Sequence, residues 1–443
     1  MKIRGLLIAT VVLAALAGVL YWSDRHKPTA EAAKPDEEAA PSILKLDENA
    51  ITKFELKKKD APAIVLAKTG SDWKIIEPKA FVADQTTVST MLSTISSLNS
   101  DRLLEDQSSN LQRYGLASPA FELDVTEKNN KTQRLLLGDN TPVGSAVYAA
   151  LAGDPRVFTL AEYHKTSLDK SLNDLRDKRL LTVSPDKVSR LEIAGKNGAI
   201  EFGHNQDEWQ ILKPKPMRAD TLAVSELVRK LTDARMDLSG SDKAATEADS
   251  AFARDASVAT VKLTDESSTQ QLQIRKAKDL YYAKSSQVDG AYKVDSSLVD
   301  AVNKKVEDFR NKKLFDFGYS EPSKLELHTS AKTYSLMRGG QDWWDNGKKM
   351  DEDSIRSLIS SLRDLSAEKF VDSGFITPEI DARVTSQDGK RVERVQISKS
   401  GANYIAKREN DAALYQLAST AVDDLQKAVA EIKPAAPPSK TPK

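Results

Sequence analysis

The stretch WKIIEPKAFVADQTTVSTMLSTISSL, residues 73–98, decides the fold, because the chain contains its pattern three times. A tryptophan opens a short strand, and an aspartate then precedes a run of periodic apolar residues. In each copy these residues fall four, seven, eight and eleven positions after the aspartate. That spacing places them on one face of a helix with a 3.6-residue period. The tryptophans are Trp73, Trp209 and Trp343, and the aspartates are Asp84, Asp220 and Asp351.

The copies lie 136 and 134 residues apart, counted from one tryptophan to the next, which indicates duplication of a domain-sized unit. Strands that alternate apolar residues with Lys or Glu flank the pattern and are typical of a sheet with one wet face. A second apolar helix closes each copy. The sequence therefore predicts an α+β protein with three tandem homologous units after an N-terminal transmembrane helix, each unit an antiparallel sheet packed with two helices. The expected segments are an anchor (1–27), a disordered stalk (28–42), units at 43–183, 184–318 and 319–433, and a disordered tail (434–443).

The N-terminal segment is apolar and uncharged from residue 5 to residue 22. About 18 helical residues span roughly 27 Å, close to the hydrocarbon thickness of a bilayer. A cleaved signal peptide could use Ala15-Leu16-Ala17 as its small-residue site. An uncleaved anchor explains better why the apolar run continues to Trp22. We expect a single pass through the inner (cytoplasmic) membrane by residues 5–22, with the body in the periplasm or outside.

Composition excludes several kinds of chemistry. The chain has 65 basic and 65 acidic residues and no cysteine, so disulfides, thiol catalysis and Cys-ligated zinc are excluded. The sequence has no basic patch with interleaved aromatic residues, so it does not predict nucleic-acid binding. The four histidines have no metal-ligand spacing, and neither a phosphate-binding loop nor a nucleophile elbow is present. We expect a protein that is not an enzyme and that binds neither a metal nor a cofactor. A pair of glycosidase carboxylates would leave no local signal in the sequence, so an enzyme is kept as a third hypothesis, after a scaffold and a binding module.

The repeated residues each have a structural and a functional interpretation. Trp73, Trp209 and Trp343 could be stacking platforms, but their equivalent positions favour a role as core anchors under the helix. Trp344 should point to the opposite face of its strand and is a candidate interface residue. The three aspartates could act as acids, but their position favours helix N-caps.

Two basic pairs, Arg176 with Lys178 and Arg310 with Lys312, lie at or after the end of a closing helix. Cations are favoured there by the helix dipole. These residues also join one unit to the next, so we expect them to brace the corner between units against a carboxylate. A site for a phosphate or a lipid head group is the alternative. All four are candidate interface residues.

The order of motifs also resembles a known family. An N-terminal anchor is followed by Trp73–Pro78 and Ala83-Asp84, then by turn motifs and a basic end. The later motifs are Tyr114-Gly115-Leu116 with Pro119, Leu137-Gly138-Asp139, Tyr148-Ala149 and Leu175–Lys178. This order is similar to that of an uncharacterised bacterial domain of unknown function in anchored envelope proteins. The resemblance implies an auxiliary component of ABC-type transporters, related by analogy to gliding-motility machinery, and it carries no catalytic residues.

Together these observations lead to two functional hypotheses. The first is a non-enzymatic, membrane-anchored envelope scaffold or accessory subunit of a protein complex, with an ABC-type transporter as the complex implied by the resemblance. The alternative is a binding module for an envelope glycan or lipid.

Overall fold

The computed structural model describes residues 42–205, 208–239, 249–250, 252–253, 256–386 and 389–436. The expected anchor, all but the last residue of the stalk, and most of the tail lie outside these ranges. No helix among the described residues is long and apolar enough to span a membrane. The chain divides after Lys178 into two compact units, and the second and third sheets share the second unit. We call each sheet with its helices a repeat.

The first repeat is a nine-stranded antiparallel sheet in the order β4-β3-β2-β1-β6-β7-β8-β9-β5. Its helices are α2 (Gln85–Ser96), α3 (Glu162–Leu168) and α4 (Leu172–Leu175). The strands are β1 (Ile51–Lys58), β2 (Ile64–Thr69), β3 (Asp72–Glu77), β4 (Phe81–Val82), β5 (Arg102–Glu105), β6 (Phe121–Glu127), β7 (Thr132–Asn140), β8 (Ala146–Leu151) and β9 (Val157–Ala161).

The second repeat has eight strands in the order β13-β12-β11-β10-β14-β15-β16-β17. Its helices are α5 (Thr221–Thr232), α7 (Ser296–Val302) and the 3-10 turn η4 (Val306–Phe309). The strands are β10 (Arg190–Gly195), β11 (Gly198–Asn205), β12 (Glu208–Lys213), β13 (Met217–Arg218), β14 (Ala256–Thr264), β15 (Thr269–Ala277), β16 (Leu280–Ser285) and β17 (Ala291–Val294).

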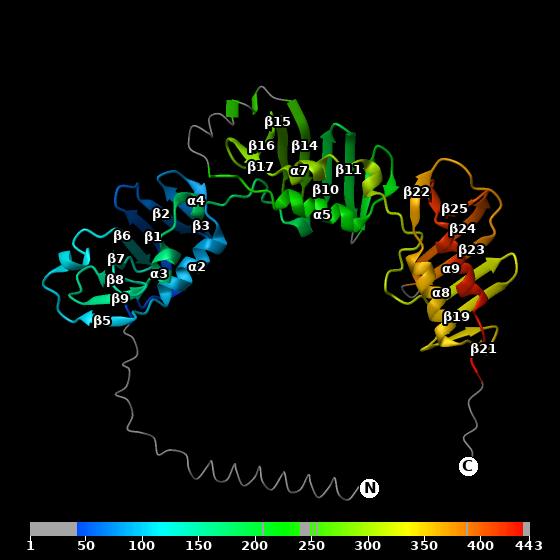
Figure 1. Ribbon diagram of the computed structural model, residues 1–443, viewed down its shortest axis with the longest axis horizontal. Coiled ribbons are helices and arrows are strands. Elements are labelled where there is room, and N and C mark those ends of the chain that lie inside the picture. The colour runs from blue at the N-terminus through cyan, green and yellow to red at the C-terminus, as the bar shows by residue number, and fades with distance from the viewer. Residues whose placement is uncertain are drawn as a thin grey trace, which may run out of the picture. The chain divides into compact units, whose positions relative to one another are not determined.

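The third repeat has nine strands in the order β21-β20-β19-β18-β23-β24-β25-β26-β22, with helices α8 (Glu352–Asp364) and α9 (Ser419–Ala430) packed against each other. The strands are β18 (Lys324–Thr329), β19 (Thr333–Gly339), β20 (Asp342–Asp345), β21 (Lys348–Lys349), β22 (Ala367–Val371), β23 (Ile380–Ser386), β24 (Arg391–Ser400), β25 (Asn403–Arg408) and β26 (Leu414–Leu417). Figure 1 shows the three sheets and their helices. Every strand pairing among the described residues is antiparallel, which is typical of an α+β fold.

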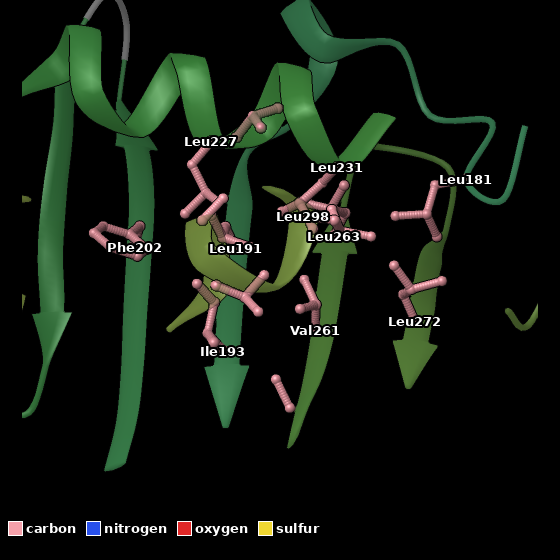
Figure 2. Packing of buried hydrophobic residues seen from close by; sticks show 14 of the residues in the cluster. Leu181, Leu191, Ile193, Phe202, Leu227, Leu231, Val261, Leu263, Leu272 and Leu298 are labelled. Atoms are coloured by element: carbon pink, nitrogen blue, oxygen red, sulfur yellow. The ribbon is translucent and has the colours of Figure 1, made fainter. Parts of the chain in front are cut away.

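The core of each repeat lies between the sheet and the helices. In the second repeat, Leu227 and Leu231 of α5 point toward Leu191, Val261 and Leu263 on the strands below (Figure 2). The tryptophans belong to these cores: Trp73, Trp209 and Trp343 are 5%, 4% and 5% exposed. Each one is therefore an apolar anchor between its strand and the first helix of its repeat.

The three aspartates cap those first helices. Their carboxylates accept the backbone N–H three residues further on, at 2.9 Å for Asp84 and 3.0 Å for Asp220 and for Asp351. Such a bond satisfies a helix donor that has no partner within the helix.

The closing helix differs from the expected continuous one in the first two repeats, where it is broken into two pieces. In the first repeat Ser171 ends the gap and starts α4 with a capping box, in which its hydroxyl accepts from Asp174 N–H and Asp174 accepts from Ser171 N–H. This local cap competes with continuation of α3. The third repeat has no such cap at this point, and α9 is continuous.

Every repeat closes on its own N-capping aspartate. The N–H of Asp84 donates to Leu175 O at 2.8 Å, and Asp220 N–H donates to Phe309 O at 2.8 Å. In the third repeat Asp351 N–H donates to Lys433 O at 2.9 Å. The chain end of each repeat is thereby tied to the start of its first helix.

Candidate functional site

The junction between the second and third repeats, inside the second unit, contains the most extensive polar network described. It is centred on Asp316, in the segment that joins the two repeats. Arg218 of the second repeat forms an ion pair with Asp316, and it donates to Lys313 O at 2.9 Å and to Tyr415 Oη at 3.1 Å. Arg218 therefore binds the joining segment and the third repeat together.

Third-repeat side chains complete the network. The N–H of Asp316 donates to both carboxylate oxygens of Glu393 at 3.0 Å, and Glu393 also accepts from Arg408 at 3.0 Å. Arg391 reaches back to Glu208 of the second repeat at 2.9 Å. The side chains of Glu393 and Arg408 are only 5% and 11% exposed, so salt should screen this pair less than a surface pair.

Electrostatics at the junction follow from burial and pairing. Burial disfavours the charge of Arg218, but Asp316 and Tyr415 outweigh this effect and raise the pKa of Arg218. Burial also raises the pKa of Tyr415 to about 12, helped by the bond from its hydroxyl to Asp411 at 2.6 Å. Tyr415 is therefore a neutral hydrogen-bonding bridge at ordinary pH.

Beside this network an open groove of about 1040 Å³ separates parts of the two repeats. One wall comes from the second repeat, through the turn at 215–217 and the end of η4. The other comes from β22 and from the turn between β25 and β26. Apolar side chains from both repeats line it, together with as many acidic as basic side chains. The apolar residues include Met217, Phe370, Phe375 and Leu414.

Arg310 and Lys312, expected to brace the corner against a carboxylate, do lie at this junction, but their contacts differ from that expectation. The guanidinium of Arg310 stacks over the ring of Phe370, 3.3 Å from its centroid. Lys312 Nζ donates to the backbone carbonyl of Glu368 at 3.1 Å. An aromatic face and a backbone oxygen thus take the place of the expected carboxylate.

Arg176 and Lys178 end the first repeat. The guanidinium of Arg176 lies over Phe81, 4.1 Å from the ring centroid, so a basic residue after the closing helix stacks on an aromatic ring in both places. Lys178 is half-buried at the end of the first unit. The structure thus brings Arg310 and Lys312 together at the groove and leaves Arg176 and Lys178 in the other unit.

Trp344 lies on the face opposite Trp343 and is 39% exposed. Its register partner on β19 is Met337, which is also exposed. The two side chains form an apolar spot on the face of the third sheet that the helices do not cover.

Buried carboxylates are held by cations. Three of the described carboxylates are buried, namely Asp124, Glu201 and Glu393. Asp124 accepts from Arg134 at 2.6 Å and from Lys57 at 3.0 Å, and these bonds lower its pKa although burial opposes them. Glu201 pairs with Arg190 at 2.6 Å and Lys213 at 2.8 Å. No group of three or more His, Asp or Glu in the described ranges is arranged to hold a metal ion.

Sequence reasoning identified Arg310 and Lys312 but missed Arg218, Asp316, Glu393 and Arg408. These residues are far apart in the chain, and no local spacing joins them. A signal does exist in the repeats themselves. Thr182 and Gln270 make the corresponding bond in the second repeat, from Thr182 N–H to Gln270 Oε1 at 2.8 Å. Replacement of this neutral pair by Asp316 and Glu393 in the third repeat marks that junction as different.

Comparison with known proteins gives a family but no characterised relative. No curated protein matches the chain. A family model described as a domain of unknown function, DUF4340, matches twice in succession, at residues 73–210 and 209–382. Each match begins at a tryptophan in the third strand of one sheet and ends within the next sheet. The family unit therefore includes the segment that joins two repeats. Since the matches cover residues 73–382 of 443, the chain belongs to the DUF4340 family.

Proposed function

We propose that this protein is a membrane-anchored scaffold of the cell envelope that acts as an accessory subunit of a larger protein complex, without an enzymatic activity of its own. The apolar segment at residues 5–22 is the anchor in this proposal. An ABC-type transporter is the complex that the family resemblance implies.

The observation that carries the proposal is the way in which the repeats are joined. The same backbone bond closes every repeat on its capping aspartate. The second and third repeats are further joined by the ion pairs Arg218–Asp316 and Arg391–Glu208. Polar networks of this kind hold a fixed geometry when all members are satisfied. Such construction suits a protein whose role is to present surfaces in a defined arrangement.

The groove beside that junction supports a binding role. It brings together apolar and charged side chains from two repeats, which is the mixture found at non-obligate protein interfaces. Because both walls are held by the junction network, a ligand would meet a preformed surface rather than one that must be ordered on binding.

The test is to purify the full chain from its native membranes in mild detergent after brief crosslinking. We expect it to resist carbonate extraction and to carry a membrane-protein partner in fixed proportion. A mock purification from cells that lack the chain is the control. Recovery of the chain alone, or in the soluble fraction, would contradict the proposal.

A glycan-binding role is the second candidate, and Trp344 favours it. Its indole lies close to Gly339, where an added Cβ would come within 3.2 Å of Nε1. The ion pair between Lys349 and Asp342, at 2.9 Å, is nearby on β20 and β21. An exposed indole with polar neighbours is suited to stacking on a sugar ring. Saturable binding of envelope oligosaccharides that is lost in Trp344→Ala, with no protein partner recovered, would favour this role.

A further inference from the structure

The groove at the junction exposes the edge of a strand. β22 is last in the strand order of its sheet and pairs with β26 on one side. On the other side the joining segment covers the beginning of β22: Leu314 N–H donates to Leu365 O and Ala367 N–H donates to Lys312 O, both at 2.9 Å, and Lys312 Nζ donates to Glu368 O at 3.1 Å. Within the described residues no strand covers that edge beyond Ala367. An open edge presents backbone donors and acceptors to which another chain can bind.

Arg310 lies at this edge with its donors available. It is half-buried, and burial lowers its pKa. No carboxylate of the described part of the chain lies within ion-pair distance of its guanidinium, which stacks on the ring of Phe370. A guanidinium has five N–H donors in a planar fork that matches a carboxylate. A carboxylate would stabilise this partly desolvated, unpaired guanidinium through charge-assisted hydrogen bonds.

The rest of the groove restricts the kind of ligand. Phe370 and Phe375 offer apolar surface. Glu307, Asp372 and Asp411 lie along the same groove, so its field is not positive overall. Like-charge repulsion therefore disfavours a long polyanion or an anionic bilayer. A single carboxylate on an otherwise neutral, extended chain can pair with Arg310 without bringing further negative charge close to the acidic side chains of the groove.

We propose that an extended segment of a partner protein adds as a strand to the edge of β22, places one carboxylate on Arg310, and packs an apolar side chain against Phe370 and Phe375. This is recognition by strand addition, in which backbone bonds supply affinity and side-chain sites supply selectivity. The inference deepens the scaffold proposal and rests on it for the existence of a protein partner.

The first experiment pans a phage-displayed library of random decapeptides against the full chain in detergent micelles. We expect enrichment of extended peptides with one Asp or Glu at a fixed position. The affinity of a synthetic selected peptide, measured by fluorescence anisotropy, should fall about tenfold or more in Arg310→Gln, the loss expected for charge-assisted hydrogen bonds. Arg310→Lys keeps the charge without the fork and should weaken binding less.

Matched controls separate this site from a general loss of charge. Arg176→Gln removes the corresponding stacked arginine of the first repeat and should leave the peptide affinity unchanged. The amide counterpart of the peptide, with Gln in place of its acid, should bind weakly and respond little to Arg310→Gln. Unchanged thermal melting of each variant shows that it is folded.

Three outcomes would overturn the inference. They are a library that yields no enriched peptide, a selected peptide that binds Arg310→Gln as well as the unaltered chain, and a site that instead binds inorganic phosphate or phosphatidylglycerol vesicles in an Arg310-dependent way. Co-purification distinguishes a failure of the groove assignment from a failure of the scaffold proposal. If Arg310→Gln retains the partner of the unaltered chain, the groove assignment fails and the scaffold stands. If the unaltered chain has no partner, the scaffold proposal fails.

Discussion

The N–H of Asp220 donates to Phe309 O at 2.8 Å, while the carboxylate of the same aspartate accepts the N–H of Ala223 at 3.0 Å. One residue thus starts helix α5 and closes the repeat that contains it. Asp84 and Asp351 make the same pair of bonds in the other repeats. The side chain has the local task and the backbone has the long-range one, so substitution can separate them.

Replacing Asp220 by alanine should remove the cap and leave the closure, since alanine keeps its backbone N–H. We expect a loss of about 1 kcal/mol in the stability of α5. Hydrogen exchange of the amides at the start of α5, Ala223 above all, should become faster. Exchange at Asp220 itself should change less, because its N–H still donates to Phe309.

Asp220→Asn is the matched control. Asparagine caps helices about as well as aspartate, so exchange in α5 should stay close to that of the unaltered chain. Equal losses in both variants would contradict the capping role and point to the charge of the carboxylate instead.

The elements that sequence reasoning predicted are those whose causes are local. An aspartate directly before a periodic apolar run marks the start of a helix through its capping bond to the N–H three residues later. The tryptophan of each repeat lies on a strand that precedes this helix, and it is buried because the residues of that strand alternate between the two faces of the sheet. The break between α3 and α4 was missed although Ser171 and Asp174 carry a capping box in the sequence. That signal is also local and could have been found.

The candidate site was harder to predict because its causes are not local. Asp316 meets Arg218 and Glu393, which lie about a hundred residues before it and 77 residues after it. No fixed separation in the sequence predicts either contact. Arg310 was identified as a brace against a carboxylate, yet it stacks on Phe370, since the edge of a sheet built later in the chain brings that ring to it. Aligning the repeats would have pointed to Asp316 and Glu393 but not to their partners.

Removing Arg218 should weaken the junction between the second and third repeats. Asp316 is a largely buried carboxylate, and Arg218→Met leaves it short of a cation. We expect the second unit to lose about 2 to 3 kcal/mol, below the range for a fully buried pair because Arg391 and Arg408 remain within 3.6 Å of Asp316. Thermal unfolding of the full chain should show the loss in one transition.

A double-mutant cycle tests whether the loss comes from this pair. Asp316→Asn alone should also destabilise the unit, and the two substitutions together should cost less than the sum of the single effects, by about 1 kcal/mol or more. Additive losses would mean that Arg218 and Asp316 act independently.

The raised pKa of Tyr415 predicts that the free energy of unfolding falls at high pH. Its folded-state pKa is about 12, raised above the ordinary value of 10.0 by burial and by its bond to Asp411. Between these values the unfolded chain releases the phenol proton and the folded chain keeps it. The stabilisation is therefore fully present below pH 10 and is lost as pH rises toward about 12. Denaturant unfolding at a series of pH values measures this loss.

Tyr415→Phe isolates that contribution. The variant lacks the titrating group, so its stability should fall less steeply than that of the unaltered chain over the same pH range. Absorbance of phenolate should show one tyrosine fewer in the last part of the titration. Parallel pH curves for the two proteins would show that Tyr415 titrates alike in the folded and unfolded states.

Trp343 and Trp344 are neighbours in the sequence with opposite environments, which makes them a matched pair. Trp343 is 5% exposed within the core of the third repeat, and Trp344 is 39% exposed on the other face. Trp343→Ala should destabilise the second unit by about 3 to 5 kcal/mol through lost burial and a cavity. Trp344→Ala should change its stability by no more than about 0.5 kcal/mol. Acrylamide should quench Trp344 more strongly than Trp343. Equal destabilisation by the two substitutions would contradict the alternation of faces along β20.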